Sequence, residues 1–215
     1  GFGLAEAADV RAIRLSSRGL DGSEFTLVTP AGNVGVRLHM PGQHQVLNAL
    51  AAAAAALACD VSLDAIAAGL GRVRPVGGRL QSAATASGAT LIDDCYNANP
   101  GSVAAALELL AACGGRRTLV LGVMAELGED SEELHRGIGE VARGAGLDRF
   151  WGVGDALKVA VEAFGDGAEW FASREALLRD ADIDLGETDT VLVKGSRSAG
   201  MEWVLQQLNQ SGEAR

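Results

Sequence analysis

The pattern of apolar and polar positions divides the chain into two parts. In the first part, three short runs alternate between apolar and polar residues, and turn signals such as Asp21-Gly22 bound them. Such alternation predicts strands with hairpin character. Beyond Pro41 the pattern favours two helices, the second of them capped by Ser62. The expected strands cover 10–15, 24–29 and 34–39, and the expected helices cover 45–58 and 63–70.

The second part follows residues 71–80, a segment rich in Gly, Pro and Arg that marks a domain boundary. From there apolar strands alternate with helices, and this order forms βαβ units with right-handed crossovers in a parallel sheet. Strands are expected near 89–93, 117–121, 149–153 and 190–194. Helices are expected near 101–112, 131–145, 155–164, 173–179 and 198–209.

These elements predict an α/β chain of two domains. Residues 79–215 form a complete Rossmann-like domain with a mostly parallel sheet. Residues 1–78 supply β-hairpins and a helix pair without a clear sheet partner. We interpret them as the incomplete C-terminal part of a larger domain.

Composition excludes several classes of protein. Hydrophobic residues make up 48% of the 215 residues, enough for a core, and the net charge of −10 argues against a nucleic-acid partner. The first residues do not resemble a signal peptide, and the Ala-rich run 49–58 is too short for membrane insertion. Cys59, Cys95 and Cys113 have neither disulfide nor metal-binding spacing, which favours a reducing cytoplasm and predicts no metal site.

The most informative segment is LIDDCYNANPGS, residues 91–102. An apolar strand ends in two carboxylates, and a turn and a helix start follow, at the kind of strand end where open α/β sheets bind ligands. Asp94 suits hydrogen bonds from sugar hydroxyls, or it caps the next helix. Tyr96 stacks on a base or packs on the sheet edge. Asn97 and Asn99 present amides to a ligand or simply occupy turn positions.

A second strand end carries basic residues. The apolar run TVLV precedes Lys194, Gly195, Ser196 and Arg197, and a helix is expected next. Free N–H groups at a helix start, together with two cationic side chains, suit a carboxylate or a phosphate. The alternative is a basic strand end exposed to water. The chain contains no G-x-x-x-x-G-K-[ST] phosphate-binding loop.

Three further segments carry candidate side chains. In VLGVMAELGED, Glu126 and Glu129 contact an amine or favour the start of the next helix, and the helix-start role suits Glu129 better. His44 and Asn48 share one helix face, where His44 is a ligand or a structural residue. Arg79 lies in the boundary segment, where it reaches phosphate groups or is solvated.

With these residues in view, the chain resembles a Mur ligase, and within that family the ligases that join D-alanyl-D-alanine to UDP-N-acetylmuramoyl-tripeptide. The matching segments lie in the family's order over roughly residues 40–205. They are PGQHQVLNALAAAAA, GGRL, LIDDCYNANPGS, VLGVMAELGED with the downstream His135, and LVKGSRSAGME. The family has an N-terminal UDP-sugar domain, a central ATPase domain and a C-terminal Rossmann-like domain. The resemblance implies that this chain covers the end of the central domain and the whole C-terminal one.

The resemblance also implies a reaction in peptidoglycan precursor synthesis that depends on ATP and Mg²⁺. The tripeptide carboxylate becomes an acyl phosphate, and the dipeptide amine displaces the phosphate. The residues implied on the ATP side are His44, Asn48, Arg79, Asp94 and Tyr96. Those implied on the dipeptide side are Asn97, Asn99, Lys194, Ser196 and Arg197, with Glu126 and His135 as further candidates. No complete catalytic set is present, so we expect the chain alone to be inactive, and we expect a monomer whose metal site lies largely elsewhere.

Three residues depart from the family's pattern. Gln45 stands where Asn is usual, Val123 where Asp is usual, and Cys95 where Ser or Thr is common. The missing carboxylate at Val123 weakens the case for an amine or water contact at that loop. Two alternatives stay open: a stand-alone nucleotide- or dipeptide-binding module without catalysis, and a related ligase such as a folylpolyglutamate synthase. The YNANP and KGSR runs weigh against the second.

Overall fold

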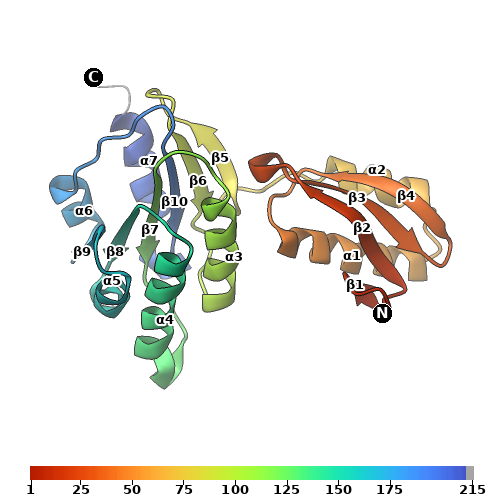
Figure 1. The fold of residues 1–215 in the computed structure, drawn as a ribbon, viewed down its shortest axis with the longest axis horizontal. Helices are drawn as coiled ribbons and strands as arrows, with labels where there is room; N and C mark the ends of the chain where they lie inside the picture. Colours follow the sequence, from red (N-terminus) through yellow and green to blue (C-terminus); the bar gives the residue numbers. More distant parts are fainter. Residues whose placement is uncertain (212–215) are drawn as a thin grey trace. The chain divides into compact units, whose positions relative to one another are not determined.

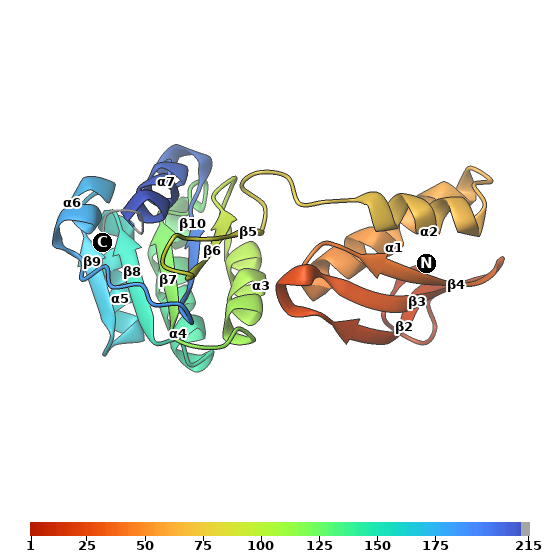
Figure 2. The ribbon, with the colours of Figure 1, turned by 90° about the horizontal axis from the view of Figure 1, so that it is seen from above.

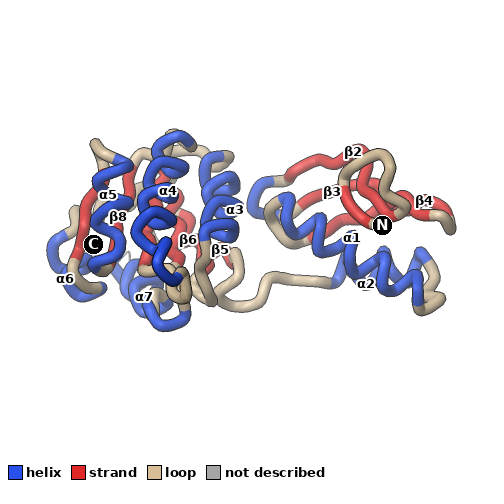
Figure 3. Tube along the Cα trace, turned by 90° about the horizontal axis from the view of Figure 1, so that it is seen from below, coloured by secondary structure: helices blue, strands red, loops and turns tan. Residues whose placement is uncertain are grey.

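A computed structural model describes residues 1–211, which form two compact units that divide between Pro75 and Val76. The first unit is a four-stranded sheet in the order β1-β2-β3-β4, covered on one face by two helices (Figures 1 and 3). β1 and β2 are parallel, and the other pairs are antiparallel hairpins. The elements are β1 (Phe2–Gly3), β2 (Val10–Ser17), β3 (Ser23–Thr29), β4 (Gly32–Leu38), α1 (Gln43–Ala58) and α2 (Leu63–Arg72).

The first unit has a core because the apolar residues of its strands and those of its helix α1 face each other. Every second residue of β3 is buried, so Phe25 and Leu27 point to the same face. On α1 the buried residues follow helical spacing and place one apolar stripe against that face. These residues are Val46, Ala49, Leu50 and Ala53.

The second unit is a six-stranded sheet in the order β5-β6-β10-β7-β8-β9, in which all neighbours are parallel except β5 and β6. The strands are β5 (Gln81–Ala84), β6 (Thr90–Asp94), β7 (Arg117–Gly122), β8 (Arg149–Val153), β9 (Ala168–Phe171) and β10 (Thr190–Lys194). β10, the last strand among the described residues, therefore lies in the middle of the sheet. The carboxyl ends of the parallel strands share one edge.

Helices cover both faces of this sheet, as Figure 2 shows. One layer holds α3 (Pro100–Ala111), α4 (Ser131–Gly144) and α5 (Lys158–Phe164). The other holds α6 (Arg174–Asp180) and α7 (Glu202–Ser211). Trp151 and Met201 are fully buried between the sheet and the second layer. The expected α/β fold with a mostly parallel sheet is confirmed.

The structure differs from the sequence expectations at a few elements. β1, β5 and β9 were not expected, because they are short, and every residue of β5 is exposed and so gives no apolar alternation. The last helix starts at Glu202 rather than at residue 198, since a 3₁₀ turn, Arg197–Ala199, and a left-handed Gly200 precede it. Among the residues that the structure describes, every helix is too short or too polar to span a bilayer.

Candidate functional site

Two neighbouring strands bring the first candidates together. β6 and β10 are parallel with Asp94 opposite Lys194 in register, so the two side chains emerge from the same face. The Lys194 ammonium lies 2.5 Å from Oδ2 of Asp94 and donates to the carbonyl of Asn97 at 2.9 Å. The Lys194 side chain is 2% exposed and that of Asp94 13%. Lys194 is therefore not a solvated strand end but the centre of a buried polar contact.

The segment around Gly78 is attached to the end of β6. Asp93 accepts hydrogen bonds from the backbone N–H groups of Gly78, at 2.9 Å, and Cys95, at 3.1 Å. The guanidinium of Arg79 lies 4.1 Å from the centre of the Tyr96 ring, a cation–π contact. Tyr96 is 49% exposed, so it is not packed into the core.

The two asparagines of the segment differ in their local roles. Asn99 caps α3, because its side chain accepts the Ser102 N–H at 2.8 Å while the Ser102 hydroxyl accepts the Asn99 N–H at 3.1 Å. The capping role considered for Asp94 thus belongs to Asn99. The side chain of Asn97 accepts the N–H of Ala98 at 2.8 Å. Both asparagines are exposed and leave their amide nitrogens toward solvent or a ligand.

A cavity of about 650 Å³ joins three of the predicted segments. Its walls come from the turn after β6, the loop after β7 and the turn after β10, so it lies at the carboxyl edge of the sheet. The candidates that line it are Tyr96, Asn97, Asn99, Glu126, Ser196 and Arg197. Lys194 and Asp94 do not line it, but Lys194 holds the Asn97 carbonyl behind it.

The turn after β10 is tied to its neighbours. The backbone N–H of Ser196 donates to the carbonyl of Val123 at the end of β7, at 3.0 Å. The hydroxyl groups of Ser196 and Ser198 lie 3.1 Å apart, and Ser196 is buried. Arg197 is 74% exposed and its guanidinium lies 3.5 Å from Glu202. Of the two cations in KGSR, Arg197 lines the cavity and Lys194 does not.

The loop after β7 rests on His135 of α4, whose side chain is fully buried. Nε2 of His135 accepts the backbone N–H of Met124 at 3.1 Å, and Nδ1 lies 2.7 Å from the carbonyl of Ser131. A carbonyl only accepts, so Nδ1 carries a proton and donates it, whereas Nε2 acts as the acceptor for the Met124 N–H. Glu126 is exposed on this loop with a left-handed φ of 63°, and Glu129 lies in the short turn before α4.

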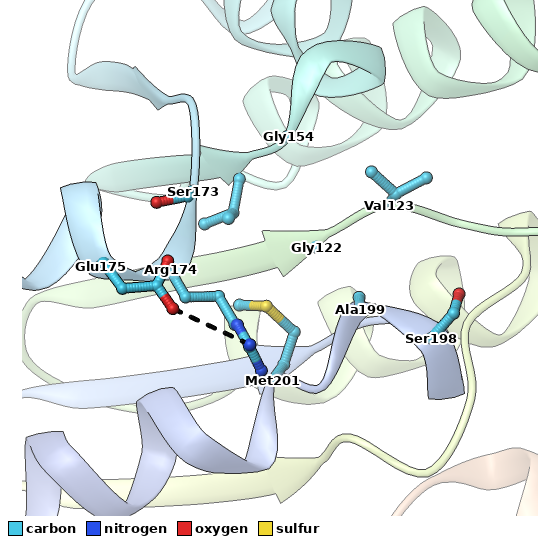
Figure 4. A pocket seen from close by; sticks show the side chains of 10 residues that line it. Gly122, Val123, Gly154, Ser173, Arg174, Glu175, Ser198, Ala199 and Met201 are labelled. Carbon is cyan, nitrogen blue, oxygen red and sulfur yellow. Dashed lines mark ion pairs between the residues drawn. The ribbon is translucent and has the colours of Figure 1, made fainter.

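A second cavity, of about 280 Å³, was not expected from the sequence. Figure 4 shows Val123 at the end of β7, Arg174 and Glu175 at the start of α6, and Met201 around the same space. Arg174 donates to the carbonyl of Gly200 at 2.7 Å and lies 3.8 Å from Glu175. One signal in the sequence indicated this side of the cavity, the Ser173 cap at the start of α6. The sequence did not predict β9, the strand that precedes this helix.

The remaining nucleotide candidates, His44 and Asn48, lie on α1 in the first unit. Asn48 is exposed, and its amide donates to the side chain of Gln45 at 3.2 Å. The His44 ring packs against Gly42, where an added Cβ would come within 2.7 Å of Cε1. Gly42 also has a φ of 95°, which favours glycine.

The thiol of Cys95 is not part of any reactive site. Burial raises the pKa of this thiol well above its ordinary value, and its Sγ donates to the carbonyl of Val193 at 3.3 Å. All three cysteines are free. Among the described residues, no group of three or more His, Cys, Asp and Glu side chains is arranged to hold a metal ion.

Comparison with known proteins agrees with this architecture. Residues 78–197 match the family described as Mur ligase, glutamate ligase domain, and residues 1–56 match the Mur ligase middle domain. A curated relative, the UDP-N-acetylmuramoyl-tripeptide--D-alanyl-D-alanine ligase of Escherichia coli K12, is 47% identical over 193 residues. That match covers 89% of this chain and 42% of the relative. The chain thus spans less than half the length of this relative.

Solved structures agree as well. MurF from Acinetobacter baumannii superposes with a TM-score of 0.87 at 33% identity, over 97% of this chain and 46% of that one. MurF from Thermotoga maritima in complex with ADP has a TM-score of 0.82 at 24% identity, covering 99% and 48%. A folylpolyglutamate synthase from Mycobacterium tuberculosis, at 22% identity and a TM-score of 0.68 over 93% and 48%, shares the fold alone. The chain belongs to the Mur ligase family.

Proposed function

We propose that the protein to which this chain belongs is an ATP-dependent ligase that joins D-alanyl-D-alanine to UDP-N-acetylmuramoyl-tripeptide in peptidoglycan precursor synthesis. The observation that carries the proposal is the cavity of about 650 Å³ whose three walls are the YNAN, AEL and SRS segments. Each wall belongs to a segment on which the family resemblance rests. The Escherichia coli relative, which carries this activity in its name, supports the substrate assignment.

The dipeptide is the substrate that suits this cavity. Its volume lies in the range of small-molecule sites, and its polar lining provides amide, hydroxyl and guanidinium donors for a carboxylate. We assign Asn97, Asn99, Ser196 and Arg197 to direct contacts with the dipeptide. Lys194 contributes to this site indirectly, since its ammonium donates a hydrogen bond to the carbonyl of Asn97.

The nucleotide is assigned to the residues around the end of β6. Asp94 offers a carboxylate for ribose hydroxyls, and the Arg79–Tyr96 pair offers a flat ring and a cation beside it. His44 and Asn48 of the first unit are separate nucleotide candidates that rest on the family resemblance. The ADP complex of the Thermotoga maritima relative supports nucleotide binding. ATP supplies the phosphoryl group that activates the tripeptide carboxylate, and Mg²⁺ enters no step derived from these residues.

The chain's contribution to catalysis is then positioning. The cavity holds the dipeptide carboxylate among donors and so orients the free amine for attack on the activated acyl carbon. A fixed orientation converts an encounter of two substrates into a reaction within one complex. The free cysteines support the cytoplasm as the compartment. The monomeric state stays a prediction.

The test is an NMR titration of the 215-residue chain with D-alanyl-D-alanine, with L-alanyl-L-alanine as the matched control. We expect shifts of amides around Asn97, Glu126 and Arg197 with the D,D-dipeptide only. Shifts elsewhere, or an equal response to both dipeptides, would contradict the assignment. In the same preparation we expect no release of phosphate from ATP, because the chain has no phosphate-binding loop.

A further inference from the structure

The loop between β7 and α4 shapes the cavity without regular structure of its own. Its residues Ala125, Glu126 and Leu127 form one wall of the large cavity, and Val123 reaches the small one. Glu126 has a φ of 63° and Gly128 a φ of 64°. A left-handed conformation at a residue other than glycine persists only where its surroundings impose it. Something outside the loop must therefore hold its path.

His135 is the side chain placed to do this. It lies on α4, eleven residues after Met124 and four after Ser131, and it contacts the backbone of both. Its Nε2 accepts the N–H of Met124, just before the cavity-lining residues, and its Nδ1–H donates to the carbonyl of Ser131, just after them. The ring thus joins the two ends of the loop.

Burial makes both contacts obligatory. His135 is 0% exposed and Met124 1% exposed, so water cannot replace the ring as the partner of the Met124 N–H. A buried N–H without a partner is costly, and the loop would move to satisfy it. The Met124 side chain, itself buried, anchors the same end of the loop by packing.

We infer that His135 is a positioning residue, which fixes the loop 123–130 in the conformation that lines the dipeptide cavity. It reaches the ligand only through the backbone of Met124, so it takes no part in proton transfer. This inference rests on the proposed dipeptide site for its ligand, while the contact itself is independent of that site.

Three substitutions separate the two contacts. His135→Gln places an acceptor near the position of Nε2 and retains the Met124 contact. His135→Asn places a donor near Nδ1 and retains the Ser131 contact alone. His135→Leu retains neither. Gln and Asn both lose the ring, but Asn is also one methylene shorter and leaves a larger void at this buried position. The unfolding free energies of the two variants are therefore compared, so that a loss of packing is told apart from the loss of the Met124 contact.

The first measurement is hydrogen exchange of the Met124 amide in the 215-residue chain. Slow exchange is expected in the unaltered chain and in His135→Gln, and fast exchange in His135→Asn and His135→Leu. The second is the dissociation constant for D-alanyl-D-alanine. It should be near that of the unaltered chain in His135→Gln and about tenfold weaker in His135→Asn. Tryptophan fluorescence confirms that each variant is folded, and if His135→Leu unfolds, the Gln and Asn variants decide.

The outcomes distinguish this inference from the proposed function. If the unaltered chain does not bind the dipeptide, the function fails, and Met124 exchange alone decides the role of His135. If the unaltered chain binds but all variants bind equally well, the positioning role is wrong and the function stands. Equal Met124 exchange in His135→Gln and His135→Asn also overturns the role.

Discussion

The ammonium of Lys194 and the carboxylate of Asp94 lie 2.5 Å apart on adjacent parallel strands, with only 2% and 13% of their side chains exposed. Taking both charges out of water is costly, and their close contact together with the Asn97 carbonyl offsets that cost. The pair links a residue assigned to the nucleotide with the backbone of the dipeptide cavity. Loss of either partner is therefore expected to affect both subsites.

Removing one partner should destabilise the second unit strongly. In Lys194→Met the Asp94 carboxylate stays buried without its ammonium, which we expect to cost about 3–5 kcal/mol. Urea unfolding followed by tryptophan fluorescence measures this, because all three tryptophans, Trp151, Trp170 and Trp203, lie in the second unit.

Two controls accompany this measurement. The double variant Lys194→Met with Asp94→Asn should lose less than the sum of the single losses. Arg136→Ala, which breaks the exposed pair with Glu132, should cost no more than about 0.5 kcal/mol. A Lys194→Met loss as small as this one would show that the buried pair contributes little.

The cap at Asn99 should be separable from its role in the cavity. Asn99→Ala removes the capping box and should cost about 1 kcal/mol of unfolding free energy. Asn99→Ser retains a capping oxygen but removes the amide, so it should restore stability and still weaken D-alanyl-D-alanine binding. Calorimetric titration of the two variants measures this. Unchanged affinity in Asn99→Ser would leave the residue with its capping role alone.

Two glycines on the same helix should respond in opposite directions to alanine. A Cβ on Gly139 would lie 2.1 Å from the carbonyl oxygen of Ala160, where α4 packs on α5, so Gly139→Ala should cost about 1–3 kcal/mol. Gly137 has open space around it, and Gly137→Ala should gain about 0.5–1 kcal/mol through helix propensity. Thermal unfolding compares them. Similar changes in both variants would rule out the close contact as the cause.

Asp148 should make stability depend on pH. Hydrogen bonds from Arg117, first of all from its backbone N–H at 2.8 Å, lower the pKa of this carboxyl from its ordinary value. A lowered folded-state pKa stabilises the fold above the ordinary value, and the contribution disappears as the pH falls through the folded-state pKa. The Asp148 side chain is 43% exposed, so water screens the interaction, and Asp148→Ala should cost at most about 1 kcal/mol near neutral pH and progressively less in acid. If the loss of unfolding free energy in Asp148→Ala is independent of pH, packing rather than the carboxylate charge accounts for it.

The sequence predicted most of the second unit because its buried strands and amphipathic helices have distinct periods. It did not predict which strands are neighbours. Nothing in the order of elements requires β10 to insert between β6 and β7, and that insertion places Lys194 beside Asp94. For this reason the sequence assigned the two residues to separate ligands, whereas the structure joins them.

The sequence predicted residues of the candidate site where a polar side chain directly follows a buried strand. Three such residues, Tyr96, Asn97 and Arg197, follow buried strands and line the cavity of about 650 Å³. Arg174 gave no signal, because the strand before it, β9, is short and only its last residue is buried. The contacts of His135 with the Met124 N–H and the Ser131 carbonyl were likewise hidden, since side-chain patterns carry no information about backbone partners.

The central place of β10 has a consequence for biosynthesis. Until the ribosome has released Thr190–Lys194, β6 and β7 have no partner between them, and their inner edges stay unpaired. The nascent domain thus cannot close around its cavity until its last strand emerges. A protein interrupted before this point would expose two open strand edges, which invite aggregation, so early termination should yield insoluble chains rather than a partly working domain.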